Sequence, residues 1–292
     1  MVAEAAPVGE SRASVRVRTV LGYALLVFFA LVFIMPFILV LVTSFKTLPD
    51  IQANPVQLWA DPAYGWTMDG IRGLDTQNVR IPRWALNSTI VTVVATLGRV
   101  FLASLAGYAL AKMSYPGKQI LFGLVIVLLA VPGVVLLIPK FLVLKELGLL
   151  NSYFGLILPQ MFDAFAIFLM KQFFEQLPDE LIEAAAIDGA SPWQTFSRVM
   201  LPLAAPGLIA LTILSVQGTW NEFLHPLIAV PSNPDLATLP LGLANLRSAF
   251  GEGQPWNTIL AGTLVTTIPI AIVFFTFQRF FVQGVAATGV KG

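Results

Sequence analysis

The 292-residue sequence has no cysteine, one histidine and few charged residues. The lack of cysteine excludes disulfide bonds and thiolate metal sites, and His225 alone cannot form a cluster of histidines around a metal. Charged residues make up 11% of the chain, less than half of the roughly 25% usual in a soluble domain. A net charge of +1 gives no indication of a nucleic-acid partner.

Hydrophobic residues, in contrast, make up 57% of the chain and occur in long runs. About 20 apolar residues suffice for a helix to cross a bilayer, whereas a soluble helical protein would carry polar outer faces at helical spacing. We therefore expect an all-α, polytopic membrane protein with six transmembrane helices. The expected spans are 20–44, 86–111, 120–144, 153–173, 203–227 and 256–281.

The orientation follows from the basic residues that flank these spans. Arg12, Arg16 and Arg18 precede the first span, and Lys112 and Lys118 lie between the second and the third. Basic residues on the other side keep the bias modest, but it favours a cytoplasmic location for both termini. The expected organisation is a cytoplasmic tail (1–19), a single transmembrane domain (20–285) and a second tail (286–292), with extracytoplasmic loops at 45–85 and 230–255 and a cytoplasmic loop at 174–202.

The cytoplasmic loop contains an acidic, alanine-rich helix between two apolar runs. Pro178, Asp179 and Glu180 are typical of a helix N-terminus, and Gly189 stands where a left-handed residue would end the helix. Leu181, Ala184, Ala185 and Asp188 have the spacing of one helix face. The sequence Ser-Pro-Trp-Gln at 191–194 then predicts a second helix that starts with a capping box.

The sequence EAAAIDGA at 183–190, followed by LPLAAP at 201–206, resembles the EAA signature of importer permeases of the ATP-binding cassette superfamily. Four further blocks are similar to the carbohydrate-importer branch, in particular to its second, maltose-permease-like subunit. These blocks are GYALAKMSYPGKQILF (107–122), LGLLNSYFGLILPQ (147–160), TWNEFLHPLIAV (219–230) and FQRFFVQGVAATGVKG (277–292).

The resemblance implies a transport subunit of a bacterial inner membrane, without catalytic residues of its own. Its coupling helix would dock on one of two cytoplasmic ATPase subunits, which would bind ATP and magnesium, since this chain has no phosphate-binding loop motif. The remaining partners would be a second, homologous permease subunit and an extracytoplasmic solute-binding protein or lipoprotein. The positions that match the motif are Glu183, Ala184, Ala185, Asp188, Gly189, Leu201 and Pro202.

Ionisable residues inside a membrane are candidates for function. Arg99 and Asp163 lie at similar depth in the second and fourth spans, so that they either pair, line the pathway together or are satisfied separately by backbone carbonyls. Arg99 also belongs to a stripe of mostly small residues at every fourth position, which predicts close helix packing. The stripe consists of Ala95, Arg99, Ala103, Gly107 and Ala111.

Two further features concern the pathway. Gln217, Trp220, Asn221 and Glu222 fall near the outer half of the fifth span, and they are candidates for sugar contact, for a gate or docking site, or for an interfacial anchor. Pro132 and Gly133 predict a kink in the third span, because proline leaves a backbone carbonyl without its partner.

The sequence therefore predicts a permease subunit of an ATP-driven importer for a sugar or oligosaccharide. A permease for glycerol phosphate or a glycerophosphodiester is the alternative, since Arg99 would suit an anion. A secondary transporter would need coupling-ion sites and repeated broken helices, and an intramembrane enzyme would need a nucleophile with its base or a metal cluster.

Overall fold

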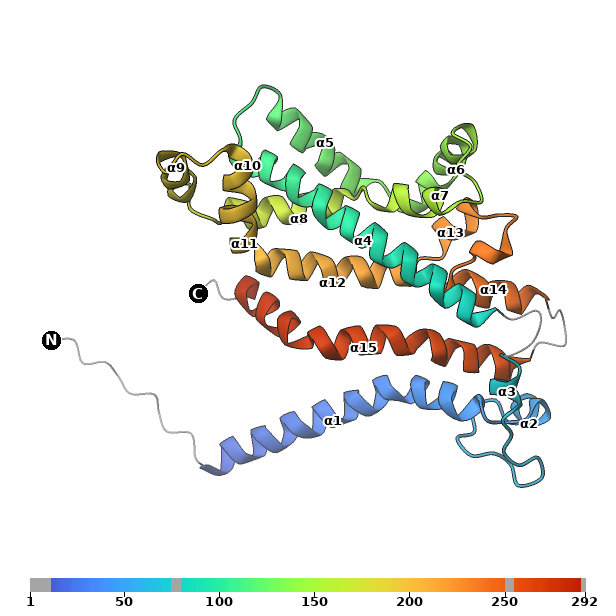
Figure 1. The fold of residues 1–292 in the computed structure, drawn as a ribbon. Coiled ribbons are helices and arrows are strands. Elements are labelled where there is room, and N and C mark those ends of the chain that lie inside the picture. Colours follow the sequence, from blue (N-terminus) through green and yellow to red (C-terminus); the bar gives the residue numbers. More distant parts are fainter. Residues whose placement is uncertain (1–11, 75–79, 250–254, 290–292) are drawn as a thin grey trace. The chain divides into compact units, whose positions relative to one another are not determined.

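The computed structural model describes the backbone of residues 12–74, 80–249 and 255–289, and the side chains of 18–74, 80–246 and 255–276 (Figure 1). Contacts divide the chain into two compact units. The first unit comprises the residues up to Gly73 together with 255–264, and the second comprises residues 74–254 and 265 onward. No β-strand occurs in the described ranges, where an isolated bridge joins Lys46 and Trp66.

The helices confirm the all-α prediction. They are α1 (Arg12–Thr43), α2 (Leu48–Ala53), α3 (Asp69–Arg72), α4 (Ile81–Lys112), α5 (Lys118–Ala130), α6 (Leu137–Glu146), α7 (Tyr153–Ile157), α8 (Ala164–Glu175), α9 (Glu180–Ile187), α10 (Pro192–Gln194), α11 (Leu201–Leu203), α12 (Ala205–Asn221), α13 (Leu224–Ala229), α14 (Leu239–Ala249) and α15 (Trp256–Gly289). Single turns η1 (Gly133–Leu136), η2 (Leu158–Gln160) and η4 (Pro234–Leu236) and the π-helix η3 (Thr195–Met200) lie between them.

Three of the expected spans are continuous helices and three are broken. Within the described ranges, α1, α4 and α15 are each long and apolar enough to cross a membrane, and three bent helix pairs bring the count to six if each pair is one span. The bend between α5 and η1–α6 is 100° and follows Val131 and Pro132, which confirms the predicted kink. The expected span 153–173 also bends, by 40°, and the helix expected up to residue 227 ends at Asn221.

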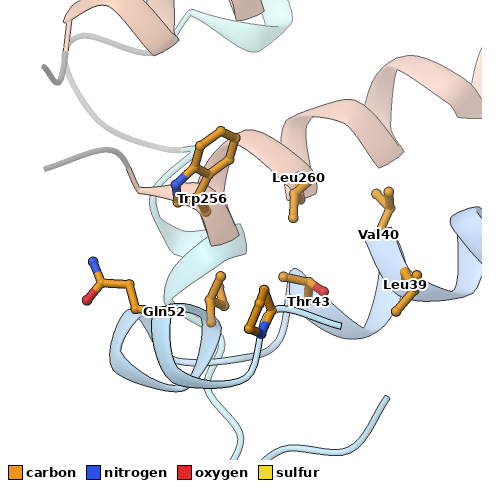
Figure 2. Close-up of a pocket in the computed structure, with 8 residues that line it drawn as sticks. Leu39, Val40, Thr43, Gln52, Trp256 and Leu260 are labelled. Carbon is orange, nitrogen blue, oxygen red and sulfur yellow. The ribbon is translucent and has the colours of Figure 1, made fainter. Parts of the chain in front are cut away.

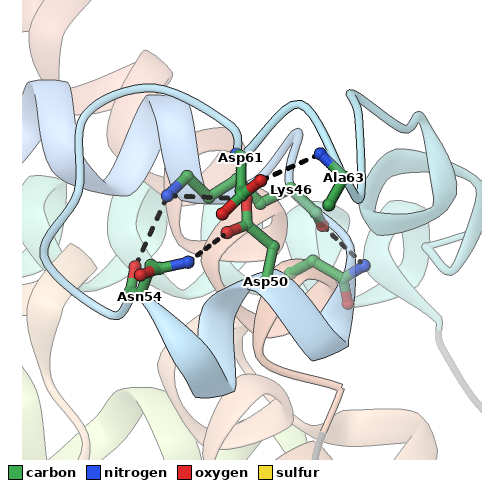
Figure 3. Close-up of polar contacts among 6 residues, drawn as sticks. Lys46, Asp50, Asn54, Asp61 and Ala63 are labelled. Atoms are coloured by element: carbon green, nitrogen blue, oxygen red, sulfur yellow. Dashed lines mark hydrogen bonds and ion pairs between the residues drawn. The ribbon is translucent and has the colours of Figure 1, made fainter.

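The loop that follows α1 in the first unit is held by a buried polar cluster (Figure 3). Lys46 and Asp50 are 1% and 0% exposed, with 3.7 Å between Nζ and Oδ2. Asp50 also accepts hydrogen bonds from the side chain of Asn54 and the backbone N–H of Asp61, both at 3.2 Å. Since a buried charge is tolerated only with such partners, the cluster fixes one conformation of the loop.

A surface pocket of about 470 Å³ lies beside this loop (Figure 2). Leu39, Val40 and Thr43 of α1 line one side, and Trp256 and Leu260 of α15 line another. The remaining lining residues are Ile51, Gln52 and Pro55. Tryptophan is frequent at a membrane–water boundary, so the pocket fits the expected outer ends of these two helices.

The core of the second unit joins α4, α8, η3 and α12. Tyr108, Phe174 and Phe196 meet with ring centroids 5.1 to 6.4 Å apart, in a range typical of favourable aromatic pairs. Met170, Met200 and Leu211 are buried in the same cluster. The predicted small-residue stripe of α4 faces this packing, because Ala95, Ala103 and Gly107 are buried.

We expect Gly107→Ala to destabilise the protein. An added Cβ would lie 2.7 Å from Cβ of Met170 and 2.8 Å from the backbone nitrogen of Lys171, so that α4 and α8 would have to separate. Overpacking of this kind costs about 1–3 kcal/mol. The matched control is Gly123→Ala in α5, where a Cβ meets nothing within 4 Å. Thermal unfolding of the detergent-purified chain should show a lower midpoint for Gly107→Ala alone, and equal midpoints would contradict the prediction.

Candidate functional site

The segment from 178 to 203 forms the helix, turn and helix that the sequence predicts. Gly189 follows α9 with φ of +78°, a left-handed conformation that favours glycine. Ser191 then begins α10 with a complete capping box, because its Oγ accepts from N–H of Gln194 at 3.3 Å while Oε1 of Gln194 accepts from N–H of Ser191 at 2.8 Å. We call residues 178–203 the coupling segment.

The two faces of α9 differ from the expectation. Leu181 and Ile182 pack against the aromatic core and Ala185 is buried, so these three residues form the inner face. Ala184 and Asp188, expected on the same side as Leu181, are exposed. The outer face carries Glu183, Ala184, Ile187, Asp188 and the following Gly189. Ala185 thus positions the helix and presents no surface to a partner.

Ile187 is the most exposed large apolar side chain of the coupling segment, with 87% of its surface accessible. An apolar residue at the tip of a rigid helix is a favourable contact point for another protein. Trp193, 57% exposed, lies near it in sequence and packs in a tilted arrangement against Phe196 at 5.4 Å between ring centroids. Leu203 at the end of the coupling segment is also exposed, so the surface of the segment is acidic with three exposed large apolar side chains.

The end of the coupling segment leads directly into α12. The π-helix η3 buries Phe196 and Met200 in the core, and Leu201 packs against the same cluster while Pro202 is exposed. The helix axis then turns by 76° into α12. Residues of α9 and η3 therefore share one hydrophobic core with α4, α8 and α12.

A second group of predicted residues surrounds Arg99. Its Nε donates a hydrogen bond of 2.8 Å to the backbone oxygen of Gln160, at the break that precedes α8. Asp163 and Glu222 both lie close enough for electrostatic interaction with the guanidinium. The structure thus brings together residues from the second, fourth and fifth expected spans.

The two carboxylates of this group bond to the first turns of helices. Asp163 accepts from N–H of Ala166 at 2.7 Å and caps α8, while Glu222, which ends α12, accepts from N–H of His225 in the first turn of α13 at 3.0 Å. Neither forms a direct ion pair with Arg99 among the ion pairs of the described side chains. Of the alternatives for Arg99, the contact with a backbone carbonyl is the one observed.

The candidates on α12 separate into two sets. Gln217 and Asn221 are exposed and joined within the helix by a bond of 2.9 Å from Nδ2 of Asn221 to the backbone oxygen of Gln217. Trp220 is 7% exposed, and its Nε1 donates to the backbone oxygen of Thr266 at 3.2 Å. Its indole therefore packs inside the protein in this structure.

The sequence did not identify two residues that hold these elements in place. Lys112, at the end of α4, donates to the backbone oxygen of Leu177 and to Asp179, at the base of the coupling segment. Asn87, near the start of α4, is fully buried and bonded to the loop after α13. A lysine in the last turn of a helix is a general pattern, so it gave no specific signal. No group of three or more metal-binding side chains occurs among the described residues.

The chain has clear relatives. The family described as binding-protein-dependent transport system inner membrane component matches residues 99–287. The chain is 35% identical to an arabinooligosaccharides transport system permease protein of Halalkalibacterium halodurans, over 93% of this chain and 95% of the relative. It is 34% identical to a diacetylchitobiose uptake system permease protein of Streptomyces coelicolor, over 89% of this chain and 84% of the relative.

Two further comparisons bear on substrate and fold. An sn-glycerol-3-phosphate transport system permease protein of Shigella flexneri is 37% identical, over 73% of this chain and 76% of the relative. A solved bacterial ABC transporter involved in the import of the acidic polysaccharide alginate has a chain of the same fold, with a TM-score of 0.77 and 23% identity over 94% of this chain and 99% of that one. The resemblance first noticed in the EAAAIDGA motif is confirmed over almost the whole sequence, and the chain belongs to the family of binding-protein-dependent transport system inner membrane components.

Proposed function

We propose that the chain is one membrane-spanning subunit of an ATP-driven importer for an oligosaccharide, and that the coupling segment receives the motion of a separate ATPase. The coupling segment carries the proposal, since it combines a rigidly packed inner face with an exposed outer face. The relatives named for arabinooligosaccharides and for diacetylchitobiose support an oligosaccharide as the solute.

The complete transporter in this proposal has four kinds of partner. A second, homologous permease subunit forms the other half of the pathway, and two cytoplasmic ATP-binding cassette subunits bind ATP and magnesium. An extracytoplasmic binding protein or lipoprotein delivers the solute, and the lipid bilayer surrounds the exposed apolar faces. Both termini are cytoplasmic, and the single permease domain extends over 20–285 between tails at 1–19 and 286–292.

The pathway runs along the group around Arg99. A guanidinium has five N–H donors, and Nε alone accounts for the contact with Gln160. The Nη groups of Arg99 have no hydrogen bond to the described protein, and Gln217 and Asn221 are also exposed. Polar groups at membrane depth line water-filled cavities or face other protein because contact with lipid is costly, which supports a pathway or a permease interface on this side.

The transport cycle then follows from the placement of these parts. A loaded binding protein docks on the extracytoplasmic loops 45–85 and 230–255, and ATP closes the two ATPase subunits. The coupling segment moves with the ATPase, and the common core carries the movement to α4, α8 and α12. The pathway opens outward, and hydrolysis resets it. Such coupling needs a two-state element that both sites bias.

A permease for glycerol phosphate is the second candidate. The sn-glycerol-3-phosphate permease of Shigella flexneri is 37% identical to this chain, and Arg99 places a cation at the proposed pathway. The two candidates differ in the solute that the charge of Arg99 would favour: a glycerol phosphate permease would use this charge to bind an anionic solute, whereas an oligosaccharide permease would transport a neutral one. A secondary transporter is a further alternative, and uptake in ATP-depleted vesicles driven by a proton gradient would support it.

The test of the proposed function uses the absence of natural cysteine, which makes any introduced cysteine the single thiol. Val56→Cys and Arg198→Cys replace exposed residues in the first loop and in η3. A membrane-impermeant maleimide should label position 56 in right-side-out vesicles and position 198 in inverted vesicles. An ATPase should co-purify with the tagged chain. The reverse labelling pattern, or a chain that transports solute without companion subunits, would contradict the proposal.

A further inference from the structure

Helix α4 of the second unit extends from one face of the expected membrane to the other without a break. Its 32 residues span about 48 Å at 1.5 Å per residue. By contrast, the third and fourth expected spans are bent, at residues 131–132 and 161–163. In Figure 1, α4 runs from α14 at one end of the second unit to α10 at the other. An unbroken helix transmits displacement along its axis more directly than a bent pair.

The outer end of α4 is fastened to the loop after α13. Nδ2 of Asn87 donates to the backbone oxygens of Asp235 and Ala237, both at 2.8 Å, and its Oδ1 accepts from the hydroxyl of Tyr153 at 2.6 Å. Oγ of Ser88 accepts from N–H of Leu239 at 2.8 Å. Asn87 and Ser88 are 0% and 2% exposed, and buried bonds of this kind fix a single arrangement.

Further contacts hold the same loop. Arg83 donates from Nε to the backbone oxygen of Asp235 at 3.2 Å, and Arg80 forms an ion pair with the side chain of Asp235. Residues 236–239 are buried, whereas Pro231, Ser232 and Asp235 are exposed. The loop therefore has an outer surface open to a partner and an inner side bonded to α4.

The inner end of α4 is fastened to the base of the coupling segment. Nζ of Lys112 lies 2.6 Å from the backbone oxygen of Leu177 and 2.5 Å from Oδ1 of Asp179. The side chain of Lys112 is 5% exposed while that of Asp179 is 76% exposed, so the buried bond to the carbonyl is the stronger constraint. Residues 177 and 179 stand directly before α9.

We propose that α4 is the rod that connects the extracytoplasmic loop 231–239 with the coupling segment, and that Asn87 and Lys112 are the positioning residues at its two ends. This inference rests on the proposed function, because it needs an ATPase at the coupling segment. It adds a defined route, by which closure of the ATPase alters the surface that the binding protein meets.

The experiment uses spin labels on the transporter purified with its partners and placed in nanodiscs. Single cysteines at Arg198, on the cytoplasmic side of the route, and at Ser232, in the exposed part of the outer loop, carry the labels in separate samples. ATP, magnesium and vanadate trap the closed ATPase. In the otherwise unaltered chain, both labels should change their spectra on trapping.

Replacing either Asn87 or Lys112 should largely abolish the response at 232 but not the response at 198. In Lys112→Met and in Asn87→Leu, the label at 198 should still respond, while most of the response at 232 is lost, because the coupling between the two ends depends on both anchors. Lys112→Arg keeps a donor and should retain most of the response. If Asn87→Leu does not assemble, Ser88→Ala removes one bond of the same anchor and takes its place.

Two variants serve as matched controls. Lys118→Met removes a lysine that, among the described residues, bonds the backbone oxygens of Ala111 and Met113, and Thr89→Val removes a hydroxyl that bonds Ala85 of its own helix. Both should leave the response at 232 unchanged. A response at 232 that persists in the Lys112 and Asn87 variants, or that is absent in the unaltered chain while 198 responds, would overturn the inference. Absence of any response at 198 would instead contradict the proposed function.

Discussion

Ile187→Asp is expected to release the ATPase from an otherwise folded and inserted chain. Ile187 is 87% exposed and touches no part of the described core, so its replacement leaves the packing of α9 intact. At the proposed interface, the aspartate would remove an apolar anchor and add to the charge of Glu183 and Asp188. Loss of such an anchor costs about 2 kcal/mol or more, which weakens binding about thirtyfold.

Co-purification of the ATPase with the tagged chain and ATP-dependent uptake are the two measurements. Ile187→Leu keeps an apolar side chain and should retain both activities. Ala185→Trp offers the opposite comparison, because Ala185 is buried and the larger side chain should lower the stability of the chain itself. Normal co-purification and uptake in Ile187→Asp would show that the outer face of α9 does not dock the ATPase.

The coupling segment could be predicted closely from its sequence because local chemistry determines it. Proline at the first helical position, serine as the cap and glycine in a left-handed conformation act within a few residues of one another, and each is found where expected. The faces of α9 were less predictable. The buried stripe includes Ile182 as well as Leu181 and Ala185, so it is rotated relative to the expected one, and alanines give little contrast between an inner and an outer face.

The interior of the membrane domain could be predicted only in part, because lipid-facing and protein-facing helix surfaces are both apolar. The sequence leaves Trp220 as a candidate for sugar contact, for a gate or docking site, or for an interfacial anchor, and it does not show the bond from the indole to the backbone oxygen of Thr266. At the breaks within the expected spans, Asp163 caps α8, and Glu222 bonds to N–H of His225 in the first turn of α13. The sequence shows carboxylates at membrane depth, but tertiary structure determines that they bond to these helix starts beside Arg99.

The largest effect on transport is expected from Arg99→Leu. This change removes the bond to the carbonyl of Gln160 and the positive charge beside Asp163 and Glu222. A buried acceptor without its partner costs about 1–3 kcal/mol, or roughly a factor of 5 to 150. The two carboxylates would also lose the charge that offsets them. Uptake should therefore fall by at least about tenfold while the ATPase still co-purifies, since Arg99 lies far along α4 from the coupling segment.

Amide variants separate charge from helix capping in the same cluster. Asparagine caps a helix about as well as aspartate, so Asp163→Asn should keep α8 and remove one charge, and Glu222→Gln keeps an oxygen for His225. Combined with Arg99→Leu, each amide should restore part of the uptake, because fewer uncompensated carboxylates remain at the pathway. In the presence of Arg99, the same amides leave a more positive pathway and should improve the uptake of glycerol phosphate relative to a neutral oligosaccharide, measured with both solutes in one set of vesicles. If the amides neither change the ratio of uptake of the two solutes nor restore uptake in Arg99→Leu, the charges around Arg99 do not act on the solute. The role of Arg99 is then structural, through its bond to the backbone oxygen of Gln160.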